Sequence, residues 1–542
     1  MSAIADTNTL STLPSPRLSF SSSRVNRVVR SLSADGHSKS DVQRRWLRAV
    51  ASRVVNARGD LESSLLDVLG IEPDDENPLE GLSIGEIGIC YEALLALVDR
   101  KDRKASGQFF TPDDAARFMA QQSLSFGSGT WLDPCCGVGN LAWHLADVQA
   151  SPDEFVRDSL VLIDRDSVAL QSAVALIAAE FAAADSNDTV NALASKSTRR
   201  DFLSVAALPP HDFAILNPPY ARASAPARFE TAKTSDSFAF FFEKIAKSAR
   251  GFISVTPAAY LAAPKYQSLR DVLDREVPGG EVFVFDNVPD TLFRGYKYGS
   301  HNTSKTNFVR AAVSVCAPAA ESWRITPIIR WQAADRSRMF EQCSTLLGPR
   351  QIGPHGEWVK LGPRMDHVWK TLRSAPRVLS DLVSSEVTPY RLDVGLTPRY
   401  YISAAFRALD RGSKATLYFN DSRDRDHAAI VLNSSIPYIW WRALDGGVTL
   451  PRRVLMSVPM PELSDADLEL ITLIKQSELE NIVVKHNAGR DNENVKHPET
   501  VVKRLNAAAL HGEFDLRLLY ASSMFPPTDV VEQRPEGDAT RS

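Results

Sequence analysis

Long apolar runs are missing from this 542-residue sequence, and so are the cysteine patterns of metal-binding or disulfide-rich proteins. No run reaches the roughly 18 apolar residues that a membrane-spanning helix needs, so we expect no membrane partner. The five cysteines form no C-x-x-C motif, although Cys135 and Cys136 are adjacent. This cysteine usage suits a reducing compartment, and we expect a cytoplasmic protein.

A strong net charge is also missing, since the formal charge is only −4. A nucleic-acid partner would therefore be held by a local basic patch and not by the charge of the whole chain. The length exceeds what one hydrophobic core supports, and predicts roughly two to four domains.

Changes in composition and in the spacing of apolar residues along the chain predict five segments. The serine-rich residues 1–40 are typical of a disordered tail, although a transit peptide has a similar composition. Apolar residues at three- and four-residue spacing predict helices in 41–105. Residues 106–330 carry a regular strand–helix alternation, 331–525 mix short strands with helices, and 526–542 are predicted to be a second tail.

Strands and helices alternate from about residue 130. Apolar strands are predicted in "TWLDPCCGVGN", "SLVLIDRD", "HDFAILNPPY", "RGFISVTPAAYL", "EVFVFDNV" and "TNFVRAAVSVCA", with helices such as "SVALQSAVALIAAEFAAA" and "SFAFFFEKIAKSA" between them. Such alternation predicts an α/β fold with a doubly wound, mainly parallel sheet. In the later region, "ADLELITLIKQSELENIVVKH" is predicted to be helical.

Glycine-rich and acidic residues follow the predicted strands, where ligands of open α/β sheets bind. Gly137 and Gly139 allow a tight turn and a close backbone approach to a ligand. A lone G-x-G is also found at dinucleotide sites, but the third glycine of that fingerprint is missing. Asp133 precedes the turn and would repel a pyrophosphate while favouring an ammonium or sulfonium ion. This pattern points to S-adenosylmethionine.

Two further acids follow the next strands. Asp164 ends the second strand, where it could accept hydrogen bonds from ribose hydroxyls or instead cap the next helix. Asp201 and Phe202 follow the basic run "KSTRR" and could flank an adenine ring. A loop acid beside a core phenylalanine is the alternative for this pair.

The order "GQFFTP", "DPCCGVGN", "VLIDRD", "RDFL" and "NPPY" resembles that of the gamma class of amino-methylating DNA methyltransferases, which includes the adenine-N6 enzymes of restriction–modification systems. The resemblance covers roughly residues 85–315. It implies a seven-stranded-type S-adenosylmethionine-dependent methyltransferase sheet, with an N-terminal helical segment and a C-terminal α+β region. The implied cofactor is S-adenosyl-L-methionine, with no metal.

The tetrapeptide Asn217-Pro218-Pro219-Tyr220 is the catalytic candidate. An exocyclic base amine is planar, and its lone pair is delocalised into the base. Acceptors at the Asn217 side chain and the Pro218 carbonyl would bond both amine hydrogens and free the lone pair, and the prolines would hold these acceptors in place. Tyr220 would stack on a base that has been flipped out of the duplex.

The resemblance implies roles for further residues. Segment 109–112 would line the methionine portion of the cofactor, and Phe293 would be a second aromatic residue against the flipped base. The implied cofactor-binding residues are Phe110, Thr111, Pro112, Asp133, Gly137, Gly139, Asp164, Asp201 and Phe202.

The C-terminal region 331–525 is predicted to recognise the DNA target. Its basic residues are interleaved with aromatic ones, which suits contacts to phosphates and bases. We expect Trp440 and Trp441 to be core residues, while Arg452 and Arg453 could contact DNA. The other clustered candidates are Arg391, Arg399, Tyr400, Tyr401, Arg407 and Arg411.

These features predict a site-specific DNA methyltransferase that modifies the N6 amine of adenine in double-stranded DNA, in a restriction–modification or phage-defence system. Cytosine-N4 methylation would use the same amine chemistry and remains an alternative. A DNA-binding subunit of a defence complex, with little activity of its own, is another. A separate restriction or specificity subunit is a possible partner, and the resemblance implies a nucleoid-associated protein of a prokaryote.

Overall fold

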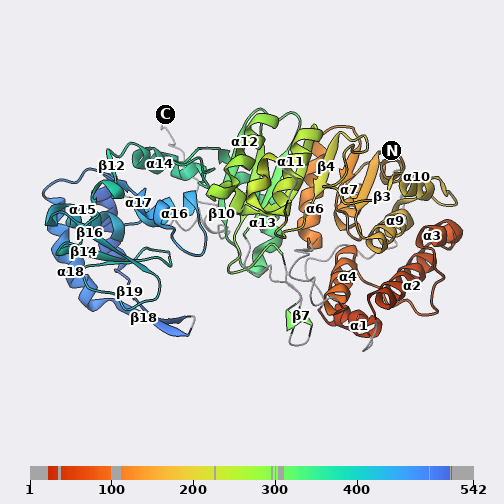
Figure 1. Cartoon of the computed structure of the whole chain (residues 1–542), viewed down its shortest axis with the longest axis horizontal. Coiled ribbons are helices and arrows are strands. Elements are labelled where there is room, and N and C mark those ends of the chain that lie inside the picture. The colour runs from red at the N-terminus through yellow and green to blue at the C-terminus, as the bar shows by residue number, and fades with distance from the viewer. Residues whose placement is uncertain are drawn as a thin grey trace, which may run out of the picture. The chain divides into compact units, whose positions relative to one another are not determined.

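The computed structural model describes residues 22–33, 38–98, 111–224, 228–293, 297–298, 301–302, 310–398, 400–487, 489–512 and 514. The chain divides into two compact units, which are described separately (Figure 1). The first comprises Met1–Tyr260, Lys265–Arg324 and Gln332–Gln342, and the second comprises Leu261–Pro264, Ile325–Trp331 and Cys343–Ser542. None of the helices in the described ranges is long and apolar enough to cross a membrane.

The first unit begins with helices, and one of them corrects a prediction. Helix α1 (Ser22–Leu32) lies within the segment expected to be a disordered tail. Its residues Val25, Val28, Val29 and Leu32 share one helical face and are buried, so packing stabilises this segment. The helices that follow are α2 (Lys39–Ala57), α3 (Glu62–Leu69) and α4 (Ile84–Val98).

Seven strands of the first unit are adjacent in one sheet, in the order β6-β9-β5-β4-β1-β2-β3. The pairs β1/β2, β1/β4, β2/β3 and β4/β5 are parallel, whereas β9 is antiparallel to both β5 and β6. The predicted doubly wound, mainly parallel sheet is therefore confirmed. The strands are β1 (Trp131–Asp133), β2 (Leu160–Asp164), β3 (Thr198–Arg199), β4 (Phe213–Leu216), β5 (Gly251–Pro257), β6 (Gly280–Phe285) and β9 (Ala311–Cys316).

The direction of winding reverses at β1, which has β2 on one side and β4 on the other. Ligands of open α/β sheets bind at such a switch point, beyond the carboxyl ends of the strands. The main helices linking the strands are α6 (Asp113–Gln122), α7 (Asn140–Asp147), α8 (Pro152–Glu154), α9 (Ser167–Phe181), α10 (Asp188–Lys196), α11 (Ser237–Ser248), α12 (Gln267–Glu276) and α13 (Arg336–Gln342), and the short strands β7 (Lys297–Tyr298) and β8 (His301–Asn302) form a pair.

The second unit mixes short sheets and helices. A four-stranded sheet contains, in this order, β13 (Val383–Ser384), β16 (Lys414–Phe419), β14 (Tyr390–Gly395) and β15 (Ala404–Ala405). Trp440 stacks on Trp369 with ring centroids 4.9 Å apart, and Trp441 is 3% exposed, which confirms that both predicted core tryptophans are buried. The apolar face of this sheet and its helices form one core.

The helix predicted at 466–486 is wrong over its second part. Helix α18 (Leu470–Glu480) ends at Glu480, and strand β18 (Ile482–Asn487) follows it. This strand forms a hairpin with β19 (Arg490–Val495). The β-branched residues in "NIVVKH" favour a strand.

The elements of this part of the chain are β10 (Trp323–Ile329), which crosses the boundary between the units, β11 (Gly348–Pro349), α14 (Asp366–Arg373), β12 (Arg377–Val378), β13 (Val383–Ser384), β14 (Tyr390–Gly395), β15 (Ala404–Ala405), β16 (Lys414–Phe419), α15 (Ser422–Asn433), α16 (Ile436–Leu444), α17 (Arg452–Met456), β17 (Pro459–Met460), α18 (Leu470–Glu480), β18 (Ile482–Asn487), β19 (Arg490–Val495) and α19 (Glu499–Leu510).

Candidate functional site

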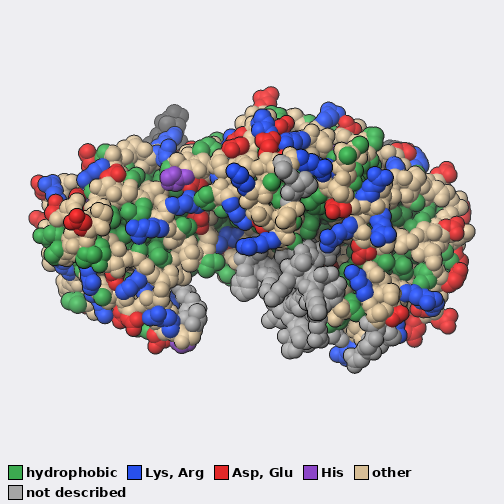
Figure 2. Space-filling model, viewed as in Figure 1, with side chains coloured by type: hydrophobic (Ala, Val, Ile, Leu, Met, Phe, Trp, Pro, Cys, Tyr) green, Lys and Arg blue, Asp and Glu red, His purple; other side chains and the backbone are tan. Residues whose placement is uncertain are grey.

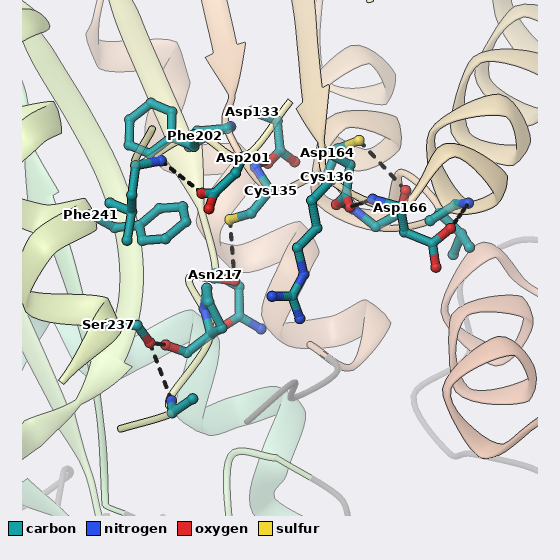
Figure 3. Close-up of a pocket in the computed structure, with 18 of the residues that line it drawn as sticks. Asp133, Cys135, Cys136, Asp164, Asp166, Asp201, Phe202, Asn217, Ser237 and Phe241 are labelled. Atoms are coloured by element: carbon teal, nitrogen blue, oxygen red, sulfur yellow. Dashed lines mark hydrogen bonds between the residues drawn. The ribbon is translucent and has the colours of Figure 1, made fainter. Parts of the chain in front are cut away.

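A cavity of about 520 Å³ opens at the carboxyl ends of β1, β2 and β4 in the first unit. Side chains from separate strand ends, among them Asp133, Asp164, Asp201 and Asn217, line this one cavity (Figure 3). Its volume is in the range of pockets that hold small molecules and cofactors. The sheet therefore brings together most of the site residues predicted from the sequence.

Asp133 ends β1 and is almost fully buried, at 1% exposure. Its Oδ1 accepts a hydrogen bond from the Cys135 backbone N–H at 3.2 Å, while no described residue hydrogen-bonds to its Oδ2. Burial raises the pKa of this carboxyl group to about 8. The Asn140 side-chain oxygen is also buried without a partner in the described chain. Unsatisfied buried acceptors are costly, so both atoms suit a ligand that brings hydrogen-bond donors.

The turn after β1 depends on glycine. Gly137 has a φ of 55° and Gly139 a φ of 93°, in the left-handed region that glycine adopts without strain. A Cβ atom on Gly139 would lie 3.0 Å from the Ala173 Cβ on α9. The turn can therefore pack closely against α9 while its backbone borders the cavity.

Asp164 ends β2 and holds this turn. Its Oδ2 accepts from the Gly137 N–H at 2.8 Å, and its Oδ1 accepts from the Asp166 N–H at 2.8 Å. The N-cap of α9 is Asp166, which accepts from the Val168 N–H at 2.9 Å, so the capping alternative for Asp164 is wrong. Each carboxylate oxygen keeps a second acceptor site. Burial raises the pKa of Asp164.

Asp201 and Phe202 both line the cavity. Phe202 is buried and stacks on Phe241 of α11, with ring centroids 4.9 Å apart and an interplanar angle of 28°. The Lys244 ammonium lies 4.6 Å from the centre of the Phe202 ring. Asp201 is exposed, which leaves its carboxylate accessible beside this aromatic pair (Figure 3).

Asn217 follows β4 directly and is held by Thr111, which precedes α6, and by Cys135, which follows β1. Its side-chain Nδ2 donates to the Thr111 Oγ1 at 2.9 Å, and its backbone oxygen accepts from the Cys135 thiol at 3.4 Å. The Thr111 backbone oxygen in turn accepts from Asn140 Nδ2 at 2.7 Å. The bond to Thr111 turns the amide nitrogen toward Thr111 and thereby sets the direction of the amide oxygen.

The two prolines and Tyr220 are also fixed in place. Pro218 is buried, and the Pro219 oxygen accepts from the Ser237 hydroxyl. The Tyr220 hydroxyl donates to the Val255 oxygen on β5 at 2.9 Å. The Tyr220 and Phe293 rings lie edge to face, with centroids 5.9 Å apart at 69°, and Phe293 is 1% exposed. The structure thus brings the two predicted stacking residues together, outside the lining of the 520 Å³ cavity.

The "GQFFTP" segment is described only at its end. Phe110 lies outside the described residues, Thr111 lines the cavity, and Pro112 occupies the N-cap position of α6. The predicted helix start at Thr111-Pro112 is therefore confirmed.

Helix α4 supplies a cavity wall that the sequence analysis missed. Gly88, Tyr91, Glu92 and Leu95 line the cavity. Their i, i+3, i+4, i+7 spacing places them on one helical face, and this spacing was the available signal. Because α4 is apolar on most sides, the pattern did not distinguish a face toward a ligand from a face toward the core.

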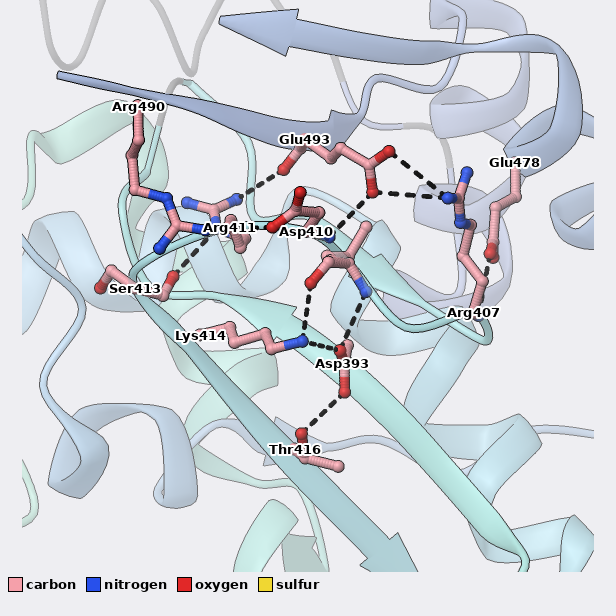
Figure 4. A network of polar contacts seen from close by, with 11 residues as sticks. Asp393, Arg407, Asp410, Arg411, Ser413, Lys414, Thr416, Glu478, Arg490 and Glu493 are labelled. Carbon is pink, nitrogen blue, oxygen red and sulfur yellow. Dashed lines mark hydrogen bonds and ion pairs between the residues drawn. The ribbon is translucent and has the colours of Figure 1, made fainter. Parts of the chain in front are cut away.

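In the second unit, several of the arginines predicted to contact DNA have structural partners (Figure 4). Arg411 is 6% exposed and donates to Asn494 Oδ1 at 2.6 Å and to the Ser413 oxygen at 2.9 Å. Arg407 pairs with Glu493 at 3.4 Å. The Arg411 donors are therefore committed to the fold, which gives this member of the cluster a structural role.

Arg452 and Arg453 also differ from each other. Arg453 pairs with the buried carboxylate of Glu357, and with Asp445 at 3.3 Å, whereas Arg452 is exposed. These ion pairs give Arg453 a structural role, and DNA contact by Arg452 or Arg453 stays a prediction. Arg391, Tyr400 and Arg452 are exposed and Tyr401 is half-buried, while Arg399 lies outside the described residues. Lys and Arg side chains are spread over the visible face of both units, with Asp and Glu among them (Figure 2).

The first unit has the fold of the S-adenosylmethionine-dependent methyltransferases. The features that define this class are the order of the strands, the antiparallel strand β9, the glycine turn after β1 and the acid that ends β2. Within that class, residues 83–250 match the family model described as N-6 DNA Methylase. This match lies within the segment that carries the motif order, and it confirms the resemblance predicted from that order.

Among the solved structures that match this chain are restriction–modification proteins. The DNA-bound type IIL enzyme MmeI is 11% identical, with a TM-score of 0.46 and coverage of 94% of this chain and 97% of that chain. The DrdV–DNA complex is 12% identical, with a TM-score of 0.41 and coverage of 89% and 58%. A modification subunit of a putative type I restriction enzyme from Vibrio vulnificus YJ016 is 11% identical, with a TM-score of 0.34 and coverage of 56% and 71%. A search of curated proteins found no match.

Proposed function

We propose that this protein is a site-specific DNA methyltransferase that methylates the N6 amine of adenine, in a restriction–modification or phage-defence system. The observation that carries the proposal is the position of Asn217, oriented by Thr111 at 2.9 Å in the cavity that also contains Asp133 and the glycine turn. The N-6 DNA Methylase match over residues 83–250 supports the same reaction.

The residues of the cavity fit S-adenosylmethionine. Asp133 Oδ2 and Asn140 Oδ1 lack donors in the described chain and would accept hydrogen bonds from it. Asp164 would accept from the ribose hydroxyls, and the Phe202 and Asp201 pair would hold the adenine. When bound, this cofactor supplies an electrophilic methyl group.

Asn217 would act on the base to be methylated. An adenine must leave the duplex before its amine can reach a pocket. The Asn217 oxygen would accept one amine hydrogen and the Pro218 oxygen the other, which localises the nitrogen lone pair. Because Thr111 and the prolines fix these groups before the reaction, they need not reorganise during it. Tyr220 and Phe293 would pack against the flipped base.

The second unit would recognise the DNA target. Its exposed basic residues, such as Arg391 and Arg452, can meet phosphates, whereas Arg411 and Arg453 support the fold. A separate restriction or specificity subunit would complete the system.

The test is methylation of mixed-sequence double-stranded DNA by the purified full-length protein, with mass spectrometry of the digested nucleosides. We expect N6-methyladenine from the wild type, and almost none from Asn217→Ala. N4-methylcytosine as the product would change the assigned base. Cofactor binding without any methylated product would contradict an active enzyme and favour a DNA-binding subunit.

A further inference from the structure

Helix α4 presents one face to the cavity although it belongs to none of the strand–helix repeats of the sheet. Gly88, Tyr91, Glu92 and Leu95 make up this face. Gly88 has no side chain, so the helix backbone itself borders the cavity there. Tyr91 and Leu95 are large, and Glu92 is the charged residue of the set.

Side chains from the sheet domain hold α4 in position at two places. The Tyr91 hydroxyl donates to Asp166 Oδ2 at 2.8 Å, next to the end of β2. Near the start of the helix, the Asp113 carboxylate accepts from the Gly85 N–H at 2.9 Å and from the Ser83 hydroxyl at 2.6 Å. A Cβ atom on Gly85 would lie 2.5 Å from the Asp113 carboxylate. The wall of the cavity is therefore fixed and closely packed.

Glu92 is half-buried on this wall, and no described residue forms a hydrogen bond or ion pair with its carboxylate. Burial raises its pKa to about 7. A half-buried carboxylate without a partner is unfavourable for folding, and such groups are usually paired.

Two independent observations indicate that this cavity receives a ligand with hydrogen-bond donors. Asp133 Oδ2 and Asn140 Oδ1 are buried acceptors without partners in the described chain, and both residues line the cavity with Glu92. S-adenosylmethionine carries an ammonium group and two ribose hydroxyls that could meet a further acceptor.

We propose that α4 is a cofactor-binding element and that the Glu92 carboxylate contacts S-adenosylmethionine through one of its donor groups. This inference rests on the proposed function, because it assumes that this cofactor occupies the cavity. It adds an acceptor from outside the sheet to those that follow β1 and β2. The sheet would then need α4, which lies before its first strand in the chain, in order to bind the cofactor at full affinity.

The test is isothermal titration calorimetry on the full-length protein, without DNA. The variants are Glu92→Ala, which removes the acceptor, and Glu92→Gln, which removes only the charge. Asp67→Asn is the matched control, because Asp67 is an exposed acid on the neighbouring helix α3. Thermal unfolding of each ligand-free variant is measured alongside.

We expect Glu92→Ala to weaken S-adenosylmethionine binding at least tenfold, with no loss of ligand-free thermal stability, and Asp67→Asn to bind like the wild type. Titration with 5′-methylthioadenosine, which keeps the ribose but lacks the amino-acid portion, locates the contact. Weakening for both ligands places Glu92 at the adenosine portion, and weakening for S-adenosylmethionine alone places it at the ammonium.

Unchanged affinity of Glu92→Ala for S-adenosylmethionine, with a wild type that binds it, would overturn this inference and leave the proposed function intact. A wild-type protein that binds neither ligand would instead contradict the proposed function. A Glu92→Ala variant that loses affinity and stability together would assign Glu92 a structural role and would also overturn the inference.

Discussion

Tyr91 on α4 donates a 2.8 Å hydrogen bond to Asp166, the residue that caps α9 and lies two positions after Asp164. The Asp166 N–H in turn donates to Asp164 at 2.8 Å. One short chain of contacts thus links an N-terminal helix to the acid that ends β2. The position of α4 and the geometry of the cavity edge are coupled through it.

Tyr91→Phe tests this coupling. Loss of the hydroxyl leaves Asp166 with one donor fewer, and should lower the free energy of unfolding by about 1–2 kcal/mol. Affinity for S-adenosylmethionine should fall several-fold, because α4 is less firmly held at the cavity. Urea denaturation and calorimetry measure the two effects. Tyr418→Phe in the second unit is the control, and equal effects of both substitutions would contradict the coupling.

Asn217→Ala should lower the methylation rate by about 10²–10³, the effect of removing one preorganised hydrogen-bonding group. Folding and cofactor affinity should change little, because the cofactor acceptors lie on other strand ends. Single-turnover methylation of DNA measures the rate. A rate within about threefold of the wild type would show that Asn217 has no catalytic role.

Asp164→Ala should weaken S-adenosylmethionine binding by about 1–3 kcal/mol, the usual effect of losing charge-assisted hydrogen bonds. The Gly137 N–H, which donates to Asp164 at 2.8 Å, would also lose its acceptor. DNA binding measured without cofactor is the control and should stay nearly constant. Calorimetry that finds unchanged cofactor affinity would limit Asp164 to holding the turn.

Asp133 should make the ligand-free protein less stable as the pH rises. The pKa of Asp133 is about 8 in the folded protein, against an ordinary value of 3.8. Its contribution to the free energy of unfolding is therefore fully present below about pH 4 and is lost as the pH rises toward 8. Asp133→Asn cannot ionise and should therefore gain stability over the wild type between pH 6 and pH 8.5. Urea denaturation at several pH values measures this difference, and a difference independent of pH would refute the assignment.

Arg453→Ala and Arg452→Ala should separate structure from DNA contact. Arg453→Ala leaves the buried Glu357 carboxylate without its partner, and should cost about 2–4 kcal/mol of stability, somewhat less than for a fully buried pair. Arg452→Ala should leave stability unchanged but weaken binding to all DNA sequences and reduce its salt dependence, if it meets phosphates. Denaturation and binding to matched and scrambled duplexes at two salt concentrations measure both. A destabilised Arg452→Ala variant would contradict this division.

Local patterns in the sequence were enough to predict the sheet and the approximate positions of its strand ends. The apolar run before Asn217 and the acid–glycine turn at Asp133 depend on residues close in the chain, so spacing and backbone preference reveal them. The family resemblance rested on the order of such motifs along the chain, and the N-6 DNA Methylase match over residues 83–250 agrees with it.

Tertiary structure decided which helix face lines the cavity and which charged side chains pair within the fold. Tyr91 meets Asp166 across 75 residues, Arg453 meets Glu357 across 96, and Arg411 meets Asn494 across 83. The periodicity of apolar residues in the sequence does not predict such pairings, because they form only when elements distant in the chain pack together and their buried charges are paired. The sequence by itself determined where the strands end and which chemistry their ends carry, whereas packing decided that α4 faces the cavity and that Arg411 and Arg453 stabilise the fold.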